Sequence, residues 1–350
     1  MLEKNVKLNN KRVLVTGAAG FIGANLVMEL VKRYSGCKIL GIDNMNNYYD
    51  PRIKEYRRDR IAEVVSDDDQ FELIRGSIAD RNLVERAFSE FKPEVVVNLA
   101  AQAGVRYSIE NPDAYMEANV MGFYNILEAC RHNPVEHLVY ASSSSVYGAN
   151  KKIPYSVEDK VDNPVSLYAA TKKSNELFAH AYSKLYGIPA TGLRFFTVYG
   201  PAGRPDMAYF GFTNKLIKGE TIKIFNYGNC KRDFTYVDDI VEGVISVMQV
   251  APSENENGAR VKVYNIGNND PVNLLDFVDI LQQELVEAGV LPSDYDFEAH
   301  KELVPMQPGD VEVTYADVTA LQEDFGFKPD TPLRDGLRSF AKWYKEYYRV

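Results

Sequence analysis

A strand, a glycine-rich turn and a helix near the N-terminus constrain the fold of this chain most strongly. Residues 12–16 form a short apolar run, glycines follow at positions 17, 20 and 23, and an apolar-periodic helical segment continues to about Tyr34. Gly17 permits a tight turn, Gly20 lets the backbone approach a pyrophosphate, and Gly23 lets the helix pack close to the strand. The free N–H groups at the start of such a helix would face the phosphates of a dinucleotide.

A second apolar strand, residues 38–43, supports that interpretation. It ends in Asp43, 20 residues beyond Gly23. A carboxylate at this place accepts hydrogen bonds from both ribose hydroxyls of NAD and repels the 2′-phosphate of NADP. The glycine spacing is G-x-x-G-x-x-G rather than G-x-G-x-x-G, so the glycines alone would be weak support. Together with Asp43 they predict NAD as the cofactor.

Apolar strands and helical segments then alternate along the chain. Further strands are expected at residues 71–75, 94–100, 137–141 and 190–196, and helices at residues 51–65, 81–91, 113–132 and 168–186. This alternation predicts an α/β fold of the Rossmann type, a doubly wound parallel sheet with helices on both faces. Ligands of such sheets bind at the carboxyl ends of the strands, where Gly17, Asp43, Ala100, the serines 142–145 and Thr197 fall.

Beyond Gly200 the rhythm changes to shorter elements with more proline and glycine. Helices are expected at residues 207–218, 237–249, 274–287, 316–325 and 333–348, and strands at residues 221–225 and 261–266. We expect a smaller mixed α/β lobe that holds the substrate. The NAD-binding domain would comprise residues 1–188 and about 236–267, and the substrate lobe about 189–235 and 268–350.

Charge and composition exclude several classes of function. The net charge of −9 argues against nucleic acid as a partner, because binding phosphodiester chains requires a basic surface. Three scattered cysteines have no metal-ligand spacing, so we expect no metal site and a reducing compartment. The polar N-terminus lacks the apolar core of a signal peptide, and no segment approaches the roughly 20 apolar residues that span a membrane. We therefore expect a cytoplasmic protein without a membrane partner.

A tyrosine and a lysine at the head of an expected helix suggest proton-transfer chemistry. Tyr168 and Lys172 lie four residues apart and so share one helix face. An ammonium beside a phenol lowers the pKa of the phenol. The spacing alone is weak, because it recurs at Tyr34/Lys38, Tyr147/Lys151 and Tyr227/Lys231. Only Tyr168 begins a helix-like run, with a serine-ended strand 25 positions upstream and a nucleotide-binding signature at the N-terminus. A serine hydroxyl at the end of that strand could complete a three-residue site acting on a substrate hydroxyl.

The chain resembles the extended short-chain dehydrogenase/reductase family, and within it the nucleotide-sugar epimerases. The residues that carry this resemblance are TGAAGFIG at 16–23, SSVYG at 144–148, YAATK at 168–172, RFFTVYGP at 194–201 and RDFTYVDD at 232–239. More narrowly it resembles the UDP-glucuronate 4-epimerases. That similarity rests on DNMNNYYD at 43–50, AAQAGVRYS at 100–108, RPDM at 204–207 and PMQPGDV at 305–311.

The resemblance implies roles for individual residues. The catalytic set would be Ser143, Tyr168 and Lys172. NAD would be bound by Gly17, Gly20, Phe21, Ile22, Gly23, Asp43, Asn44, Asn47, Ser77, Ile78, Leu99, Ala100, Ala101, Asn119, Ser142, Tyr168, Lys172, Phe195 and Val198. The UDP-sugar would be bound by Arg106, Ser143, Ser144, Thr197, Arg204, Arg232, Gln307 and Asp310. One departure is Ser77, where the family usually has an aspartate on the adenine amine, so we expect a weaker adenine contact.

The implied reaction is a 4-epimerisation of UDP-glucuronate to UDP-galacturonate. Tyr168 would take the proton of the 4-hydroxyl as hydride passes to NAD⁺, and the 4-keto sugar would turn over and take the hydride back. Arg204 and Thr197, with Ser144, would hold the carboxylate and prevent its loss as carbon dioxide. The helices at 113–132 and 168–186 resemble a pair that forms a homodimer interface in the family.

Other activities stay open at this point. Against a dehydratase of the same fold, Ser144 and Ser145 replace the Asp-Glu pair that eliminates water. Against a decarboxylase, Thr197 replaces the usual asparagine. The intact Ser143, Tyr168 and Lys172 speak against a non-catalytic nucleotide-binding regulator. UDP-glucose and UDP-N-acetylglucosamine remain alternative substrates, because the small Thr314 would not exclude an N-acetyl group.

Overall fold

The computed structural model describes residues 1–67, 69–306 and 312–350, and its centre is a seven-stranded parallel sheet. The strand order is β10-β6-β5-β4-β1-β2-β3. The strands are β1 (Arg12–Thr16), β2 (Lys38–Asp43), β3 (Phe71–Arg75), β4 (Val95–Asn98), β5 (His137–Ser143), β6 (Ala190–Phe195) and β10 (Val261–Ile266). Every pairing in this sheet is parallel. The order reverses between β1 and β4, and ligands of doubly wound sheets bind at such a reversal.

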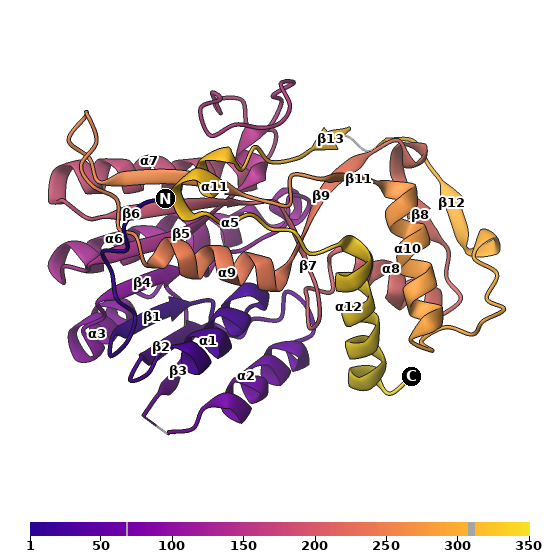
Figure 1. The fold of residues 1–350 in the computed structure, drawn as a ribbon, viewed down its shortest axis with the longest axis horizontal. Coiled ribbons are helices and arrows are strands. Elements are labelled where there is room, and N and C mark those ends of the chain that lie inside the picture. Colours follow the sequence, from indigo (N-terminus) through magenta and orange to yellow (C-terminus); the bar gives the residue numbers. More distant parts are fainter. Residues whose placement is uncertain (68, 307–311) are drawn as a thin grey trace.

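Helices cover both faces of the sheet (Figure 1). On one face lie α1 (Phe21–Arg33), α2 (Arg52–Val64), α9 (Val237–Met248) and α11 (Thr319–Phe325). On the other lie α3 (Arg81–Phe91), α6 (Gly122–His132) and α7 (Leu167–Tyr186). The predicted doubly wound α/β fold is confirmed.

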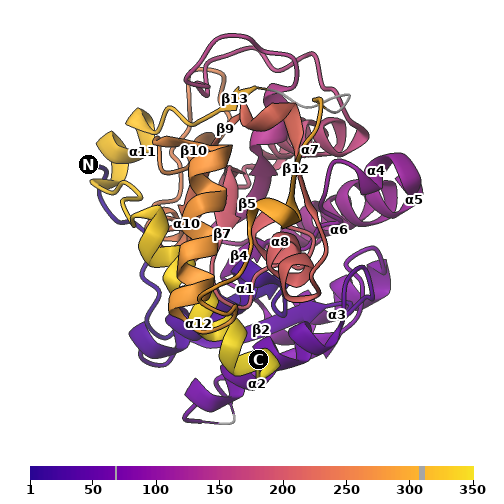
Figure 2. The same cartoon turned by 90° about the vertical axis from the view of Figure 1, so that its right-hand side faces the viewer.

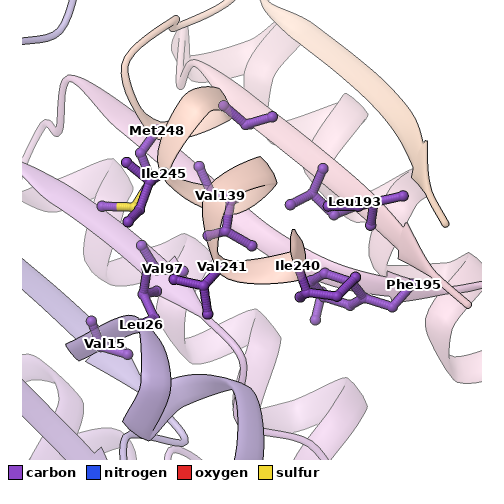
Figure 3. Packing of buried hydrophobic residues seen from close by; sticks show 14 of the residues in the cluster. Val15, Leu26, Val97, Val139, Leu193, Phe195, Ile240, Val241, Ile245 and Met248 are labelled. Carbon is purple, nitrogen blue, oxygen red and sulfur yellow. The ribbon is translucent and has the colours of Figure 1, made fainter. Parts of the chain in front are cut away.

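The buried side chains of each strand alternate between two hydrophobic clusters. In β1, Val13 and Val15 join the cluster under α1 and α9, whereas Leu14 joins the one under α3 and α6. Figure 3 shows Val15, Val97 and Val139 directed from neighbouring strands toward the helices of the first cluster. This near-continuous apolar character is what a sheet buried on both faces requires.

The glycine turn brings α1 very close to the sheet. Gly17 has φ of +70°, and a Cβ there would lie 2.9 Å from the backbone N of Ala100 after β4. A Cβ on Gly23 would lie only 2.1 Å from the carbonyl O of Gly17. Both positions therefore require glycine, the first for its conformation and the second for helix–strand packing.

A second lobe lies at one end of the sheet and is seen face-on in Figure 2. Its helices are α8 (Ala208–Ile217), α10 (Leu274–Glu287) and α12 (Leu333–Tyr348). Its strands are β7 (Thr197–Tyr199), β8 (Ile222–Ile224), β9 (Lys231–Tyr236), β11 (Pro271–Asn273), β12 (Lys301–Leu303) and β13 (Val313–Thr314). Buried aromatic side chains, among them Phe210, Phe277 and Phe340, form its own core.

One buried carboxylate connects the second lobe to the chain that leaves the large sheet. Asp233 in β9 accepts backbone N–H bonds from Asn268 at 2.7 Å, Asn269 at 3.1 Å and Ala316 at 2.9 Å.

The expected domain boundary at residue 188 lies before β6, although β6 belongs to the large sheet. We propose that the first domain extends to about residue 196.

Two expected helices differ from the structure. The segment expected as one helix from 113 to 132 is divided into α5 (Pro112–Tyr115), a π-helical turn η1 (Met116–Met121) and α6. The expected helix from 316 begins only at Thr319, because Ala316 pairs with Tyr155 as an isolated bridge. A short α4 (Tyr107–Glu110) was not expected.

Within the described residues, no helix has the length and apolar composition needed to cross a membrane.

The packing at Gly23 gives a stability prediction. Gly23→Ala should lower the free energy of unfolding by about 1–3 kcal/mol, because the new methyl meets the Gly17 carbonyl and forces a backbone shift. Gly211→Ala is the matched control, since its Cβ would meet nothing nearer than 3.8 Å within α8. That change should be neutral or stabilise the protein by roughly 0.5–1 kcal/mol. Urea unfolding measures both, and equal stability of Gly23→Ala and wild type would contradict the packing argument.

Candidate active site

A cavity lies where the carboxyl ends of β1, β2, β4 and β5 meet. Most of the residues predicted to bind the cofactor line it. These are Gly17, Gly20, Phe21, Ile22, Gly23, Asp43, Asn44, Ser77, Ile78, Leu99, Ala100, Ala101, Ser142, Tyr168, Lys172, Phe195 and Val198. Ser143 and Arg204, predicted to contact the substrate, line the same cavity. The topology thus brings the glycine turn and the predicted catalytic residues into one space.

The glycine turn has the features that a dinucleotide requires. Gly20 is the N-cap of α1, and no side chain caps this helix end. Its first N–H groups therefore remain available to a phosphate. A Cβ on Gly20 would lie 2.8 Å from the Gly17 carbonyl, so a larger residue would fill the cradle. These residues fit the pyrophosphate of NAD.

The predicted ribose-binding acid, Asp43, is buried and paired with a lysine. Its Oδ2 accepts the Ala19 N–H at 3.1 Å, which ties the acid to the glycine turn. Its Oδ1 lies 3.2 Å from Nζ of Lys54, and both side chains are less than a tenth exposed. Lys54 also donates to Asn46 at 3.1 Å. A ribose at this place would therefore meet both a carboxylate and an ammonium.

The three predicted catalytic side chains come from β5 and α7. Ser166 caps α7 by accepting the Ala169 N–H at 3.1 Å, which places Tyr168 in the first turn. The Lys172 ammonium donates to the Ala141 carbonyl in β5 at 2.8 Å. The Ser143 hydroxyl accepts the Ser145 N–H at 3.1 Å, so its own proton stays available to a ligand oxygen.

Burial shifts the pKa values of both Tyr168 and Lys172. Burial raises the pKa of Tyr168, while Ser143 and Arg204 act to lower it. Burial also lowers the pKa of Lys172 to about 8. The Lys172 ammonium donates to the Ala141 carbonyl, whereas the charge of Arg204 acts to lower the pKa of Tyr168 and that of Asp206 acts to raise it.

Arg204 is paired within its own loop. Its Nε donates to Oδ1 of Asp206 at 3.0 Å, and its Nη2 donates to Oδ2 of the same carboxylate. Tyr48 donates to Asp206 Oδ2 at 3.2 Å from the loop after β2. Although burial favours the protonated acid, Arg204 holds the pKa of Asp206 below its usual value. Arg204 thus enters the cavity as half of an ion pair.

Three other predicted substrate residues line a neighbouring hollow between β7, α8 and β9. They are Arg106, Thr197 and Arg232. Met207 lines both this hollow and the main cavity, so the two spaces adjoin. The Arg106 guanidinium lies 5.4 Å from the ring centre of Phe225, and Arg232 donates to the carbonyls of Lys231 and Glu312.

The remaining predictions are placed as follows. Asn47 is exposed and Asn46 lines the cavity instead. Asn119 is buried behind the wall, where it bonds the backbone of Gln102. Ser144 begins a short 3₁₀ turn, outside the lining of both spaces. Gln307 and Asp310 lie outside the described residues.

Several residues around the cavity were missed by sequence reasoning. Lys54 and Arg57, three residues apart on α2, are both buried. Arg57 donates to the carbonyls of Ala19, Ala202 and Gly203 at 2.8–3.2 Å and so joins the glycine turn to the loop of Arg204. Two cations on one face of a strongly charged helix look like a solvated surface in the sequence. The i, i+3 spacing just after the strand that ends at Asp43 was the available signal.

Comparison with known proteins identifies the family to which this chain belongs. Residues 14–340 match the family described as GDP-mannose 4,6 dehydratase. Over 349 residues the chain is 48% identical to protein CapI of Staphylococcus aureus, covering 97% of this chain and 99% of that protein. It is 45% identical over 351 residues to UDP-glucuronate 4-epimerase 4 of Arabidopsis thaliana, covering 97% of this chain and 76% of that one.

A solved structure is similar over the whole fold. The crystal structure of UDP-glucuronic acid 4-epimerase from Bacillus cereus, in complex with UDP-glucuronic acid and NAD, matches with a TM-score of 0.82. The identity is 32%, and the match covers 96% of this chain and 100% of that one. The chain therefore belongs to the GDP-mannose 4,6-dehydratase family, a branch of the extended short-chain dehydrogenase/reductases.

Proposed function

We propose that this protein is an NAD-dependent UDP-sugar 4-epimerase and that its substrate is UDP-glucuronate, which it converts to UDP-galacturonate. The observation that carries the proposal is the placement of Tyr168, Ser143 and Arg204 in the cavity that also holds the glycine turn. A base for a sugar hydroxyl, a cation for a carboxylate and a cradle for a dinucleotide are the groups that this reaction needs. The relatives and the similar crystal structure support the same substrate.

When bound, NAD supplies a reversible hydride acceptor. The glycine turn, Asp43 and Lys54 hold it, and Tyr168 removes the proton of the sugar 4-hydroxyl and later returns one. Ser143 donates a hydrogen bond to the same oxygen, and the Arg204 charge favours the phenolate form of Tyr168. Net redox is zero, because oxidation at carbon 4 is followed by reduction on the opposite face of the same carbon.

Retaining the substrate carboxylate is the second task of the site. A 4-keto sugar with a carboxylate on the adjacent carbon loses carbon dioxide readily when the breaking bond aligns with the carbonyl π system. A planar guanidinium that binds a carboxylate through two charge-assisted bonds restrains its rotation. Arg204 lines the same cavity as Tyr168, and Thr197 borders the adjoining hollow where UDP would extend toward Arg232.

We also propose that the protein acts in the cytoplasm as a homodimer and provides a sugar donor for polysaccharide synthesis. Large apolar side chains are exposed on α4, η1 and α7. They are Ile109, Met116, Met121, Leu177 and Leu185, which are 45–80% exposed. Leu177 and Leu185, eight residues apart, share one face of α7, as a helix-packing interface requires.

The catalytic role of Tyr168 gives the first prediction of this function. Tyr168→Phe should keep the fold and NAD binding and lose epimerisation by about 10²–10⁴-fold, because the general base is gone. Chromatography of UDP-glucuronate and UDP-galacturonate measures the rate. A variant with more than about a tenth of the wild-type rate would place the base elsewhere.

Cofactor choice gives a second prediction. Wild type should bind NAD more tightly than NADP, because Asp43 repels a 2′-phosphate. Asp43→Asn should reduce the ratio of the affinity for NAD to that for NADP, since it leaves Lys54 without its counter-charge. Asp59→Asn, an exposed change on the same helix α2, is the control and should leave the preference unchanged. Calorimetric titration of cofactor-free protein measures the affinities, and tighter binding of NADP by wild type would contradict the role of Asp43.

The carboxylate contacts give a third prediction. Arg204→Ala should weaken UDP-glucuronate far more than UDP, and Thr197→Val should keep the positive charge but release one hydrogen bond. Both variants should form some UDP-pentose or UDP-4-keto-pentose with release of carbon dioxide. Mass spectrometry detects these products. If both variants only slow epimerisation, the idea of a restrained carboxylate fails, and turnover of UDP-glucose but not UDP-glucuronate by wild type would overturn the substrate.

The exposed apolar face gives a prediction about assembly. Light scattering at micromolar concentration should give twice the mass of the chain, and Leu177→Glu with Leu185→Glu should halve it, because charges would then enter a packed helix interface. A monomer mass for wild type would remove the dimer proposal.

A further inference from the structure

The arginine proposed to hold the substrate carboxylate is already bound to a carboxylate of its own loop. Residues 204–207 form a tight turn in which the Met207 N–H donates to the Arg204 carbonyl at 3.1 Å. Pro205 occupies the second position, where proline presets the backbone of a turn. The turn sets Arg204 and Asp206 side by side and allows the two parallel bonds described above.

A tyrosine from the loop after β2 supports this ion pair. Tyr48 donates to Oδ2 of Asp206 at 3.2 Å, and its ring lies 4.8 Å from that of Tyr107. A Cβ on Gly104, which has φ of +99°, would come within 2.8 Å of the Tyr48 hydroxyl. Burial raises the pKa of Tyr48 to about 12, so the hydroxyl is a hydrogen-bond donor at neutral pH. Asp206 is therefore held from two directions.

This arrangement determines which edge of Arg204 a ligand meets. Asp206 occupies the Nε and Nη2 edge of the guanidinium, and the bonds found among the described residues leave Nη1 and the second N–H of Nη2 to a ligand. Arg204 and Tyr48 line the cavity, whereas Asp206 is not among its lining residues. A substrate carboxylate must therefore bind an arginine that is fixed in direction and whose charge is already partly compensated.

We propose that Asp206 is a positioning residue that sets the orientation of the substrate carboxylate and weakens its binding. The inference rests on the proposed function, because it needs a sugar that carries a carboxylate. Asp206 holds the guanidinium so that Nη1 and Nη2 meet the carboxylate in one plane, and its negative charge opposes the like charge of the ligand. Asp206 thereby lowers the affinity for the substrate but keeps the carboxylate in a fixed orientation while the 4-keto sugar exists.

Loss of this support would allow a defined side reaction. If Arg204 can swing, the carbon 5–carbon 6 bond of the 4-keto sugar can align with the carbonyl. The bond then breaks, carbon dioxide leaves, its electron pair passes to carbon 5 as an enolate, and water supplies a proton there. The product is a UDP-4-keto-pentose, with one reduced cofactor for each keto sugar released, or a UDP-pentose if the keto group is reduced again.

The test is Asp206→Asn, which keeps the shape of the side chain and removes its charge. The KM for UDP-glucuronate should fall by about two- to fivefold, the range of a partly exposed charge interaction. The kcat for epimerisation should fall by about tenfold or more, because a misplaced reacting group is costly. The fraction of decarboxylated product should rise, whereas inhibition by UDP alone should not change. Tyr48→Phe should shift the same three values in the same direction by less.

A matched control is Asp50→Asn. Asp50 and Arg52 form another two-residue carboxylate–arginine pair, but the side chains are 41% and 82% exposed and lie outside the cavity lining. This variant should have wild-type kinetics and products. An increase in the KM of Asp206→Asn without decarboxylated product, or no change in any value, would overturn the inference. The proposed function would still stand if wild type epimerises UDP-glucuronate. Wild type that does not act on UDP-glucuronate would remove both.

Discussion

A buried ion pair fixes the helix on which the chemistry depends. Glu176, one turn beyond Lys172 on α7, accepts two bonds from Arg194 of β6 at 2.8 and 2.9 Å, and both side chains are 4% exposed. Glu176 also accepts the Ser142 hydroxyl at 2.7 Å, so one carboxylate joins α7, β5 and β6 directly behind the cavity. Removing one partner of such a pair typically costs about 3–5 kcal/mol, because the other charge is left buried. The distance from Tyr168 to Ser143 is thus set by the core.

The catalytic geometry and the cofactor cradle therefore have different origins. The cradle comes from close backbone packing at Gly17 and Gly23. The part of the cavity proposed to hold the sugar is formed by charged side chains on loops. Arg57 of α2 joins this part to the cofactor cradle by donating to backbone carbonyls of both. The rigid part holds the groups that every dinucleotide enzyme of this fold needs. The loop part, with Arg204 and Asp206, holds the groups that we propose distinguish one sugar from another.

The sequence was sufficient to predict the sheet and most helices, because apolar periodicity and glycine spacing record backbone requirements directly. The roles of Ser143, Tyr168 and Lys172 stay predictions. It failed where a side chain finds its partner through tertiary contact. Lys54 on Asp43 and Asn119 behind Gln102 have no local pattern. The π turn in the segment expected as a continuous helix contains Asn119, whose side-chain amide donates to Gln102 and Thr171. The expected effect of Lys172 on Tyr168 stays a prediction, and in this structure the Lys172 ammonium donates to the Ala141 carbonyl.

The central claim is that the hydride removed from carbon 4 returns to the opposite face of the same carbon within one active site. The most direct measurement is the reaction of UDP-glucuronate labelled with deuterium at carbon 4, in ordinary water, followed by NMR of the UDP-galacturonate. The account predicts that the product keeps its deuterium at carbon 4, because the hydride never exchanges with solvent. Product with hydrogen from water at carbon 4 would contradict the account and indicate epimerisation by proton exchange.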